Sequence, residues 1–398
     1  MDEKKLPLEA AALMAEASQR CGGLHNFGDP SFRIGLDMLL KSLNDEGHLS
    51  ESGKHMFAHR IVESLINRLT LESYCSRFPA IEEEAIDSPV VIVGLPRTGT
   101  TMLHRLLARD PRFYTANFWE VRFPSPMTDA AAGGADPRIA AAKAEVAMMV
   151  EAMPELLTMH PIDAELPDEE VILMEHSFFS AMDAYANLPS YSAWLENQDQ
   201  TPAYEYLKRQ LKFLQWQKRQ RGEVAQRWIL KSPHHVHSME TLFKVFPDVK
   251  IIQTHRDPLQ TIPSMGSFAY TIWCVYSDAA DPKAAGRHWA ARFAGGMRRS
   301  MAFRDRMPAD RFLDVWYVDA VSTPIKVAES VYPFIGMPLT DEVRDRMLAW
   351  MGESRRDKRA AHDYSIDKVG LSVEGLEQDF ADYRQRYILP RQAGAVAA

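Results

Sequence analysis

The sequence has little of what would tie it to a membrane, to nucleic acid or to an oxidising compartment. Only three cysteines occur in 398 residues, without paired or Cys-x-x-Cys spacing. This scarcity suits a reducing cytoplasm and excludes a cysteine-based zinc site. No stretch approaches the ~18 consecutive apolar residues of a transmembrane helix. The net charge of −8 disfavours a general nucleic-acid binder, which would show a basic field.

Short apolar runs rich in β-branched residues alternate with helical patterns along most of the chain. This alternation predicts an α/β fold, in which helices flank a parallel sheet. Four strands are expected, at 89–93, 227–230, 249–254 and 312–316. The expected divisions are an N-terminal helical layer at 1–87, the main α/β domain at 88–390, an inserted helical segment for a substrate pocket at about 137–220, and a frayed tail at 391–398.

The turn after the first expected strand concentrates groups that bind anions. Gly94 and Gly99 have the spacing of a phosphate-binding Walker loop, but Thr100 stands where that loop needs a lysine. The cation is instead Arg97, inside the loop. Backbone N–H groups of the turn and the positive end of the following helix would point at one spot. The pattern predicts an anion site and argues against ordinary nucleoside triphosphate hydrolysis.

Polar or cationic side chains also follow the other expected strands. Ligands of parallel sheets bind beyond the carboxyl ends of the strands. Lys231, Arg256 and Tyr317 each come after a strand, so we expect them to share one rim with Arg97. This convergence indicates a site more strongly than any single motif does.

These motifs resemble those of the sulfotransferases that use 3′-phosphoadenosine 5′-phosphosulfate (PAPS). Residues 94–101 are similar to the family's 5′-phosphosulfate loop, in the arginine form of tyrosylprotein sulfotransferases and of a broad bacterial branch. Residues 252–256, with Ser264 eight residues on, are similar to its 3′-phosphate motif. Further similarities to the bacterial branch lie at Trp119-Glu120, 230–235 and His362-x-Tyr364. The resemblance covers roughly 88–390 and implies a P-loop-like α/β domain.

The resemblance implies an enzyme that moves a sulfuryl group from PAPS to a hydroxyl or amine of a small, apolar or aromatic acceptor. Adenosine 3′,5′-bisphosphate (PAP) would be the product, and no metal is required. The loop would hold the 5′ end, Arg256 and Ser264 the 3′-phosphate, and Tyr317 the adenine or ribose. The implied donor-binding residues are Pro96, Arg97, Thr98, Gly99, Thr100, Thr101, Arg256, Ser264, Tyr317, Lys358 and Arg359.

Two residues compete as the base that activates the acceptor. Glu120 lies beyond the first helix, where the resembling tyrosylprotein enzymes place a catalytic glutamate. His235 follows the second strand, where cytosolic relatives carry a catalytic histidine. Lys231 would bridge the sulfuryl oxygens as a point charge, with Arg97 beside it. The aromatic residues expected in the acceptor pocket are Trp119, Phe123, Phe268 and Trp273.

Two other interpretations remain open at this point. One is a nucleoside triphosphate-dependent kinase or hydrolase of the P-loop class, which the missing Walker lysine disfavours. The other is a non-catalytic relative that binds PAP but transfers nothing. The oligomeric state is also open, with a homodimer among the alternatives.

Overall fold

One parallel sheet forms the centre of the computed structural model, which describes residues 8–127, 134–354 and 365–396. Its strands lie in the order β2-β3-β1-β4-β5. Their bounds are Val90–Gly94 for β1, Phe113–Tyr114 for β2, Arg227–Lys231 for β3, Lys250–His255 for β4 and Phe312–Trp316 for β5. The predicted α/β fold and its four strands are therefore confirmed. The two-residue edge strand β2 escaped prediction because it is too short to show a period.

The central strand is buried on both faces, as its unbroken apolar run predicts. Alternate residues of β1 enter different cores. Val91 joins the larger cluster, with residues of 201–220 and 239–245, whereas Val90 and Ile92 join the cluster formed with residues of the helices at 100–107, 324–334 and 341–354. A side chain at Gly94 would place its Cβ 2.2 Å from the Thr254 hydroxyl on β4. Glycine is therefore required where the loop at 94–101, called the donor loop below, leaves the sheet.

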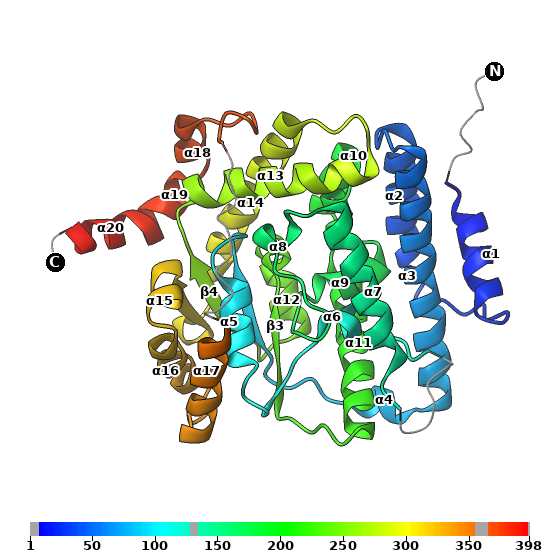
Figure 1. Cartoon of the computed structure of the whole chain (residues 1–398), viewed down its shortest axis with the longest axis horizontal. Helices are drawn as coiled ribbons and strands as arrows, with labels where there is room; N and C mark the ends of the chain where they lie inside the picture. The colour runs from blue at the N-terminus through cyan, green and yellow to red at the C-terminus, as the bar shows by residue number, and fades with distance from the viewer. Residues whose placement is uncertain (1–7, 128–133, 355–364, 397–398) are drawn as a thin grey trace.

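Helices surround the sheet (Figure 1). The first layer comprises α1 (Ala10–Arg20), α2 (Phe32–Asp45), α3 (Glu51–Arg77) and α4 (Ala80–Glu83). Those that follow are α5 (Thr100–Leu107), α6 (Phe118–Arg122), α7 (Pro137–Ala152), α8 (Leu156–Met159), α9 (Val171–Met174), α10 (Pro189–Glu196), α11 (Thr201–Gln220) and α12 (Met239–Val245). The remainder are α13 (Pro258–Tyr276), α14 (Pro282–Arg304), α15 (Tyr317–Ser322), α16 (Pro324–Phe334), α17 (Asp341–Ser354), α18 (Val373–Asp379), α19 (Ala381–Tyr383) and α20 (Leu389–Val396).

Single turns complete the path: η1 (Glu175–Ser177), η2 (Met182–Ala184), η3 (Pro233–His237), η4 (Ala309–Arg311) and η5 (Arg384–Ile388). One expectation is corrected here. Pro124 and Pro126 predict that 115–126 forms a loop, but within this stretch Asn117 and Glu120 form a capping box that starts α6. Residues 391–396, within the expected frayed tail, are helical and belong to α20.

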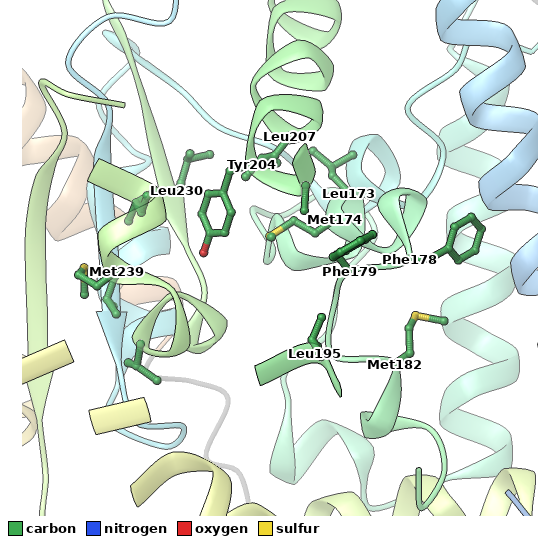
Figure 2. Packing of buried hydrophobic residues seen from close by; sticks show 14 of the residues in the cluster. Leu173, Met174, Phe178, Phe179, Met182, Leu195, Tyr204, Leu207, Leu230 and Met239 are labelled. Carbon is green, nitrogen blue, oxygen red and sulfur yellow. The ribbon is translucent and has the colours of Figure 1, made fainter. Parts of the chain in front are cut away.

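The N-terminal helices share their core with the main domain. Leu36, Phe57 and Leu65 belong to the same buried cluster as residues of the sheet. Figure 2 follows this cluster from Leu230 on β3 through Tyr204 and Leu207 on α11 to the turn that carries Leu173 and Phe178. Helix α3 therefore lies directly on the segments that build the site. None of the helices in the described residues combines the length and apolar character that crossing a membrane requires.

Candidate active site

The loop after β1 turns sharply because two of its residues adopt left-handed backbone conformations. Gly99 has φ 83°, and a Cβ there would lie 3.2 Å from the Tyr317 ring. Arg97 has φ 66°, which is uncommon for a residue with a side chain. The Thr98 hydroxyl lies 2.6 Å from the Leu95 carbonyl oxygen and 2.6 Å from the Thr254 hydroxyl. The side chain of Thr98 therefore holds the loop from inside, and the following N–H groups open α5.

Arg256, at the end of β4, ties this loop to the end of β5. One guanidinium nitrogen donates to the Arg97 carbonyl at 2.9 Å, and the guanidinium lies 4.0 Å above the Tyr317 ring. The carboxyl ends of β1, β4 and β5 thus deliver Arg97, Arg256 and Tyr317 to one place, the rim expected from the strand order.

Lys231, at the end of β3, approaches the same loop from the other side. Its fully buried side chain places Nζ 2.6 Å from a carboxylate oxygen of Glu169 and 3.4 Å from the Thr101 hydroxyl. Its backbone N–H donates to Glu170 at 2.8 Å. The ammonium therefore has a fixed position behind the first turn of α5.

A cavity of about 910 Å³ opens beside the loop. Its surface is mainly apolar, and α3, α7, α8 and α13 all contribute to it. The methionines that line it are Met56, Met102, Met148, Met149, Met153, Met159 and Met265. Flexible thioether side chains suit an apolar ligand of irregular shape. The volume falls within the range of cavities that enclose whole small molecules.

A histidine–aspartate pair lies where the cavity meets the loop. His160 Nε2 is 3.2 Å from Asp168 Oδ1, and the imidazole ring is nearly parallel to the ring of Phe268. Arg97 donates to the carbonyls of Thr158 and Met159, which precede this histidine. Burial alone would raise the pKa of Asp168, but its hydrogen-bonded contact with His160 and the nearby charges of Lys231 and Arg105 outweigh burial and lower it. Asp168 is therefore an ionised partner for the histidine.

Most of the implied donor-binding residues line this cavity. They are Pro96, Arg97, Gly99, Thr100, Thr101, Arg256 and Tyr317, joined by Phe268 from the expected acceptor pocket. Ser264 lies buried within α13, outside the lining. Lys358 and Arg359 fall outside the described residues, as do His362 and Tyr364.

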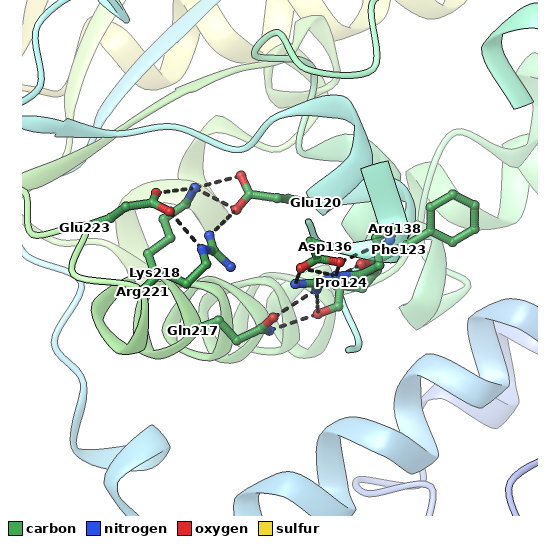
Figure 3. Close-up of polar contacts among 9 residues, drawn as sticks. All are labelled: Glu120, Phe123, Pro124, Asp136, Arg138, Gln217, Lys218, Arg221 and Glu223. Atoms are coloured by element: carbon green, nitrogen blue, oxygen red, sulfur yellow. Dashed lines mark hydrogen bonds and ion pairs between the residues drawn. The ribbon is translucent and has the colours of Figure 1, made fainter. Parts of the chain in front are cut away.

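The structure corrects the expectation that Glu120 is a base. Its carboxylate is 1% exposed and lies outside the cavity lining. Figure 3 shows it between two cations: Lys218 Nζ is 2.7 Å from both oxygens, and Arg221 is 3.0 Å from one. The other oxygen also accepts the N–H of Asn117. A carboxylate with these partners stabilises the start of α6 and is unavailable to an acceptor.

His235 is corrected for the same reason. The side chain is fully buried, with Nε2 2.6 Å from Glu170 and Nδ1 2.8 Å from the Tyr204 hydroxyl. Burial alone would raise the pKa of Glu170, but the hydrogen bond from His235 helps to lower it. Since Glu170 also accepts the backbone N–H of Lys231, this buried chain of contacts positions the end of β3.

Three of the four expected aromatic residues also lie elsewhere. Trp119 packs beneath Arg138 and Arg221, with centroid distances of 4.6 Å and 5.5 Å. Phe123 packs against the buried hydrophobic cluster that contains Phe118, Trp119 and Leu156. Trp273 is 1% exposed, and its indole N–H donates to the Asp183 carbonyl at 3.0 Å. These rings support the cavity wall from behind.

Sequence reasoning missed His160, Asp168 and Glu169 as site residues. Pro167 and the three acidic residues after it predict a helix start at 167–170, whereas Pro167 makes an isolated β-bridge to Asn117 and the helix begins only at Val171. The available signal was the density of His, Asp and Glu in an otherwise irregular segment. In the described residues, no group of three or more His, Cys, Asp or Glu side chains is arranged to hold a metal ion.

Comparison with known proteins identifies the family. Residues 89–341 match the model of the sulfotransferase family. The chain belongs to this family. It is 26% identical over 300 residues to omega-hydroxy-beta-dihydromenaquinone-9 sulfotransferase Stf3 of Mycobacterium bovis, an alignment that covers 72% of this chain and 71% of that protein.

Two solved sulfotransferases share the fold of nearly the whole chain. STF9 from Mycobacterium avium superposes with a TM-score of 0.85 at 27% identity, covering 97% of this chain and 98% of that one. STF1 from Mycobacterium tuberculosis H37Rv gives 0.81 at 28% identity, covering 94% and 99%. The protein is therefore a sulfotransferase with the P-loop-like α/β fold, and the kinase or hydrolase interpretation is not favoured.

Proposed function

We propose that this sulfotransferase takes its sulfuryl group from PAPS and passes it to the hydroxyl group of an apolar small molecule held in the cavity. The observation that carries the proposal is the union of two features. A cationic, N–H-rich loop and a mainly apolar cavity of about 910 Å³ share one wall. The donor needs the first feature because it is anionic at both ends, and an apolar acceptor needs the second.

The donor end offers separate contacts to the two ends of the nucleotide. Backbone N–H groups of 97–101 and the start of α5 suit the 5′-phosphosulfate. Arg256 suits the 3′-phosphate, because its guanidinium is held at the edge of the loop and keeps further N–H donors. The Tyr317 ring beneath it suits the adenine or ribose.

The acceptor end suits a molecule with extensive apolar surface. The wall is mainly apolar, and methionine, phenylalanine and isoleucine side chains all contribute to it. The relative Stf3 is named for a menaquinone derivative, which is also an apolar small molecule with a hydroxyl group. We propose the same class of acceptor for this chain, but not the same compound.

His160 is the base that we assign. It lines the cavity beside the donor loop, and Asp168 orients the ring and stabilises the imidazolium that forms. As the acceptor oxygen bonds to sulfur and the sulfur–oxygen bond to the leaving phosphate breaks, the hydroxyl proton passes to the imidazole. Glu169 is a weaker candidate because its carboxylate is paired with Lys231 at 2.6 Å. Lys231 lies outside the cavity lining with its ammonium paired to Glu169, so its role is to position that carboxylate and the first turn of α5.

The test combines binding and transfer. Calorimetric titration with PAP should show tight binding to the wild type, strong loss in Arg256→Ala, and retention in Arg306→Ala, a matched change of an exposed arginine. PAPS should then sulfate long-chain alcohols, which mass spectrometry detects. Preference for ATP with Mg²⁺ over PAP would overturn the donor assignment. Binding of PAP without transfer to any apolar alcohol would favour the non-catalytic alternative.

A further inference from the structure

The cavity carries a second polar cluster on α3 and the segments that pack against it. Arg60 on α3 donates to Glu175 in η1 at 2.5 Å, and its guanidinium lies 4.0 Å from the centre of the Tyr185 ring. The Tyr185 hydroxyl donates to the same carboxylate at 2.7 Å. Arg60 and Tyr185 both line the cavity. Glu175 thus fixes both side chains while they face the space that we assign to the acceptor.

A second ion pair belongs to this cluster. Arg122 at the end of α6 donates to Glu145 on α7 at 2.7 Å, and both residues line the cavity. The charge of Glu145 also acts on Arg60, so the two ion pairs are neighbours. The cluster therefore contains two guanidinium groups and two carboxylates, which balance in charge.

Arg60 belongs to a different element of the cavity wall from the donor loop. In Figure 1, α3 stands towards the right of the view, whereas α5 and α15, which carry donor-loop contacts, lie towards the left. Arg60 and the donor loop line the same cavity, together with methionines from α5, α7, α8 and α13. A long acceptor whose hydroxyl group reaches His160 would therefore place its other end near Arg60.

An ion pair in an apolar cavity wall loses hydration, and its mutual attraction repays this cost only where further hydrogen bonds satisfy the remaining N–H groups. Arg60 has five N–H donors, and its hydrogen bond to Glu175 uses Nη1. In the described part of the chain, the other nitrogens of this cavity-lining guanidinium have no hydrogen bond within the protein, which leaves them available to a bound molecule.

We propose that Arg60 and its neighbours form an acceptor subsite for a second polar group, a neutral hydrogen-bond acceptor such as a carbonyl oxygen. This inference rests on the proposed function and names its substrate class: long molecules with a hydroxyl at one end and a carbonyl-type oxygen at the other. A neutral group fits better than an anion. Both guanidinium groups already face carboxylates, and a third carboxylate would be repelled by Glu145 and Glu175.

Matched acceptors test the subsite. The probes are 1-alkanols, methyl esters of ω-hydroxy fatty acids and the corresponding free acids, at chain lengths from about six to sixteen carbons. The ester should exceed the alkanol in kcat/KM by about 10- to 100-fold at one preferred length, the range for a hydrogen bond to a charged group. The free acid should be poorer than the ester. A preference for the acid, or equal rates for ester and alkanol at every length, would overturn the proposal.

Variants then identify the residue responsible. Arg60→Met with Glu175→Gln removes the ion pair without leaving a buried charge, and the ester-to-alkanol ratio should fall towards one. Arg60→Lys should restore part of the ratio. Arg77→Met changes an exposed arginine of the same helix and should keep the wild-type ratio.

Titration with PAP distinguishes a fault in the subsite from a fault in the donor site. Unchanged PAP affinity in the variants shows an intact donor site, and an unchanged ester preference in Arg60→Met/Glu175→Gln would then overturn the subsite alone. Failure of the wild type to bind PAP or to sulfate any of these alcohols would overturn the proposed function and the subsite together.

Discussion

The two ends of the cavity are built in different ways. At the donor end, loops that directly follow parallel strands supply the contacts, and neighbouring strands bring Arg97, Arg256 and Tyr317 together. At the acceptor end, the contacts come from helices and irregular segments between Met56 and Phe293. Strand pairing positions the first set, whereas only side-chain packing positions the second.

This difference explains why the donor end could be predicted from the sequence and the acceptor end could not. A strand, a glycine turn and a helix start are local patterns, and a parallel sheet places all such turns on one edge. A methionine that lines a cavity has the same sequence signature as a methionine in a core. Substitutions can test this contrast between the donor end and the acceptor end, beginning at His160, where the two ends meet.

Loss of His160 should have the largest effect. In His160→Ala, the acceptor proton has no positioned base, so single-turnover transfer should slow by roughly 10²- to 10⁴-fold. Asp168→Asn should slow transfer less, and PAP affinity should persist in both variants. The measurement is rapid-quench transfer from PAPS with PAP calorimetry beside it. If Glu169→Gln removed activity and His160→Ala did not, the base would be the glutamate.

Breaking the Glu120 ion pair should lower the free energy of unfolding and leave the rate of sulfuryl transfer nearly unchanged. Lys218→Met removes one partner of a buried carboxylate that keeps Arg221, so the free energy of unfolding should fall by about 1–3 kcal/mol. Urea denaturation measures the loss, and transfer per folded molecule should remain near that of the wild type. A Glu120→Gln variant with normal stability and a hundredfold lower rate would restore Glu120 as the base.

The misassigned bases show where sequence reasoning stops. Glu120 and His235 are residue types that act as general bases. Each also follows a helix or strand at a place in the chain where the resembling enzymes carry their base. Burial decides between them and His160, and burial depends on contacts with α11, a helix about 100 residues away along the chain from Glu120. The sheet, the donor loop and the shared rim needed no such information, so the sequence predicted them.

Acid should destabilise the protein because burial lowers the pKa values of several histidines. Burial lowers the pKa of His104 to about 4 and those of His176 and His234 to about 3. In the unfolded chain these groups titrate near 6.5, so between about pH 6.5 and pH 4 the unfolded state binds more protons. Stability therefore rises with pH across this window and is lost on acidification, by about 2 kcal/mol per histidine at pH 5.

Urea unfolding at pH 8 and pH 5 measures this loss. His176→Gln, which keeps a partner for Gln210, should make the pH dependence shallower, whereas His25→Gln at an exposed position should leave it unchanged. Equal slopes for His176→Gln and the wild type would show that His176 is not held neutral by its burial.

The smallest effect is expected in the apolar wall, where no single side chain dominates. Met149→Gln preserves size but places an amide against the acceptor, so kcat/KM for a long alkanol should fall about fivefold, the equivalent of roughly one buried methylene group. PAP affinity should not change, since Met149 lies on α7 away from the donor loop. Leu348→Gln on exposed α17 is the control. An equal loss for acceptors too short to reach α7 would mean that the substitution acts through the fold, and that the two ends of the cavity are not independent.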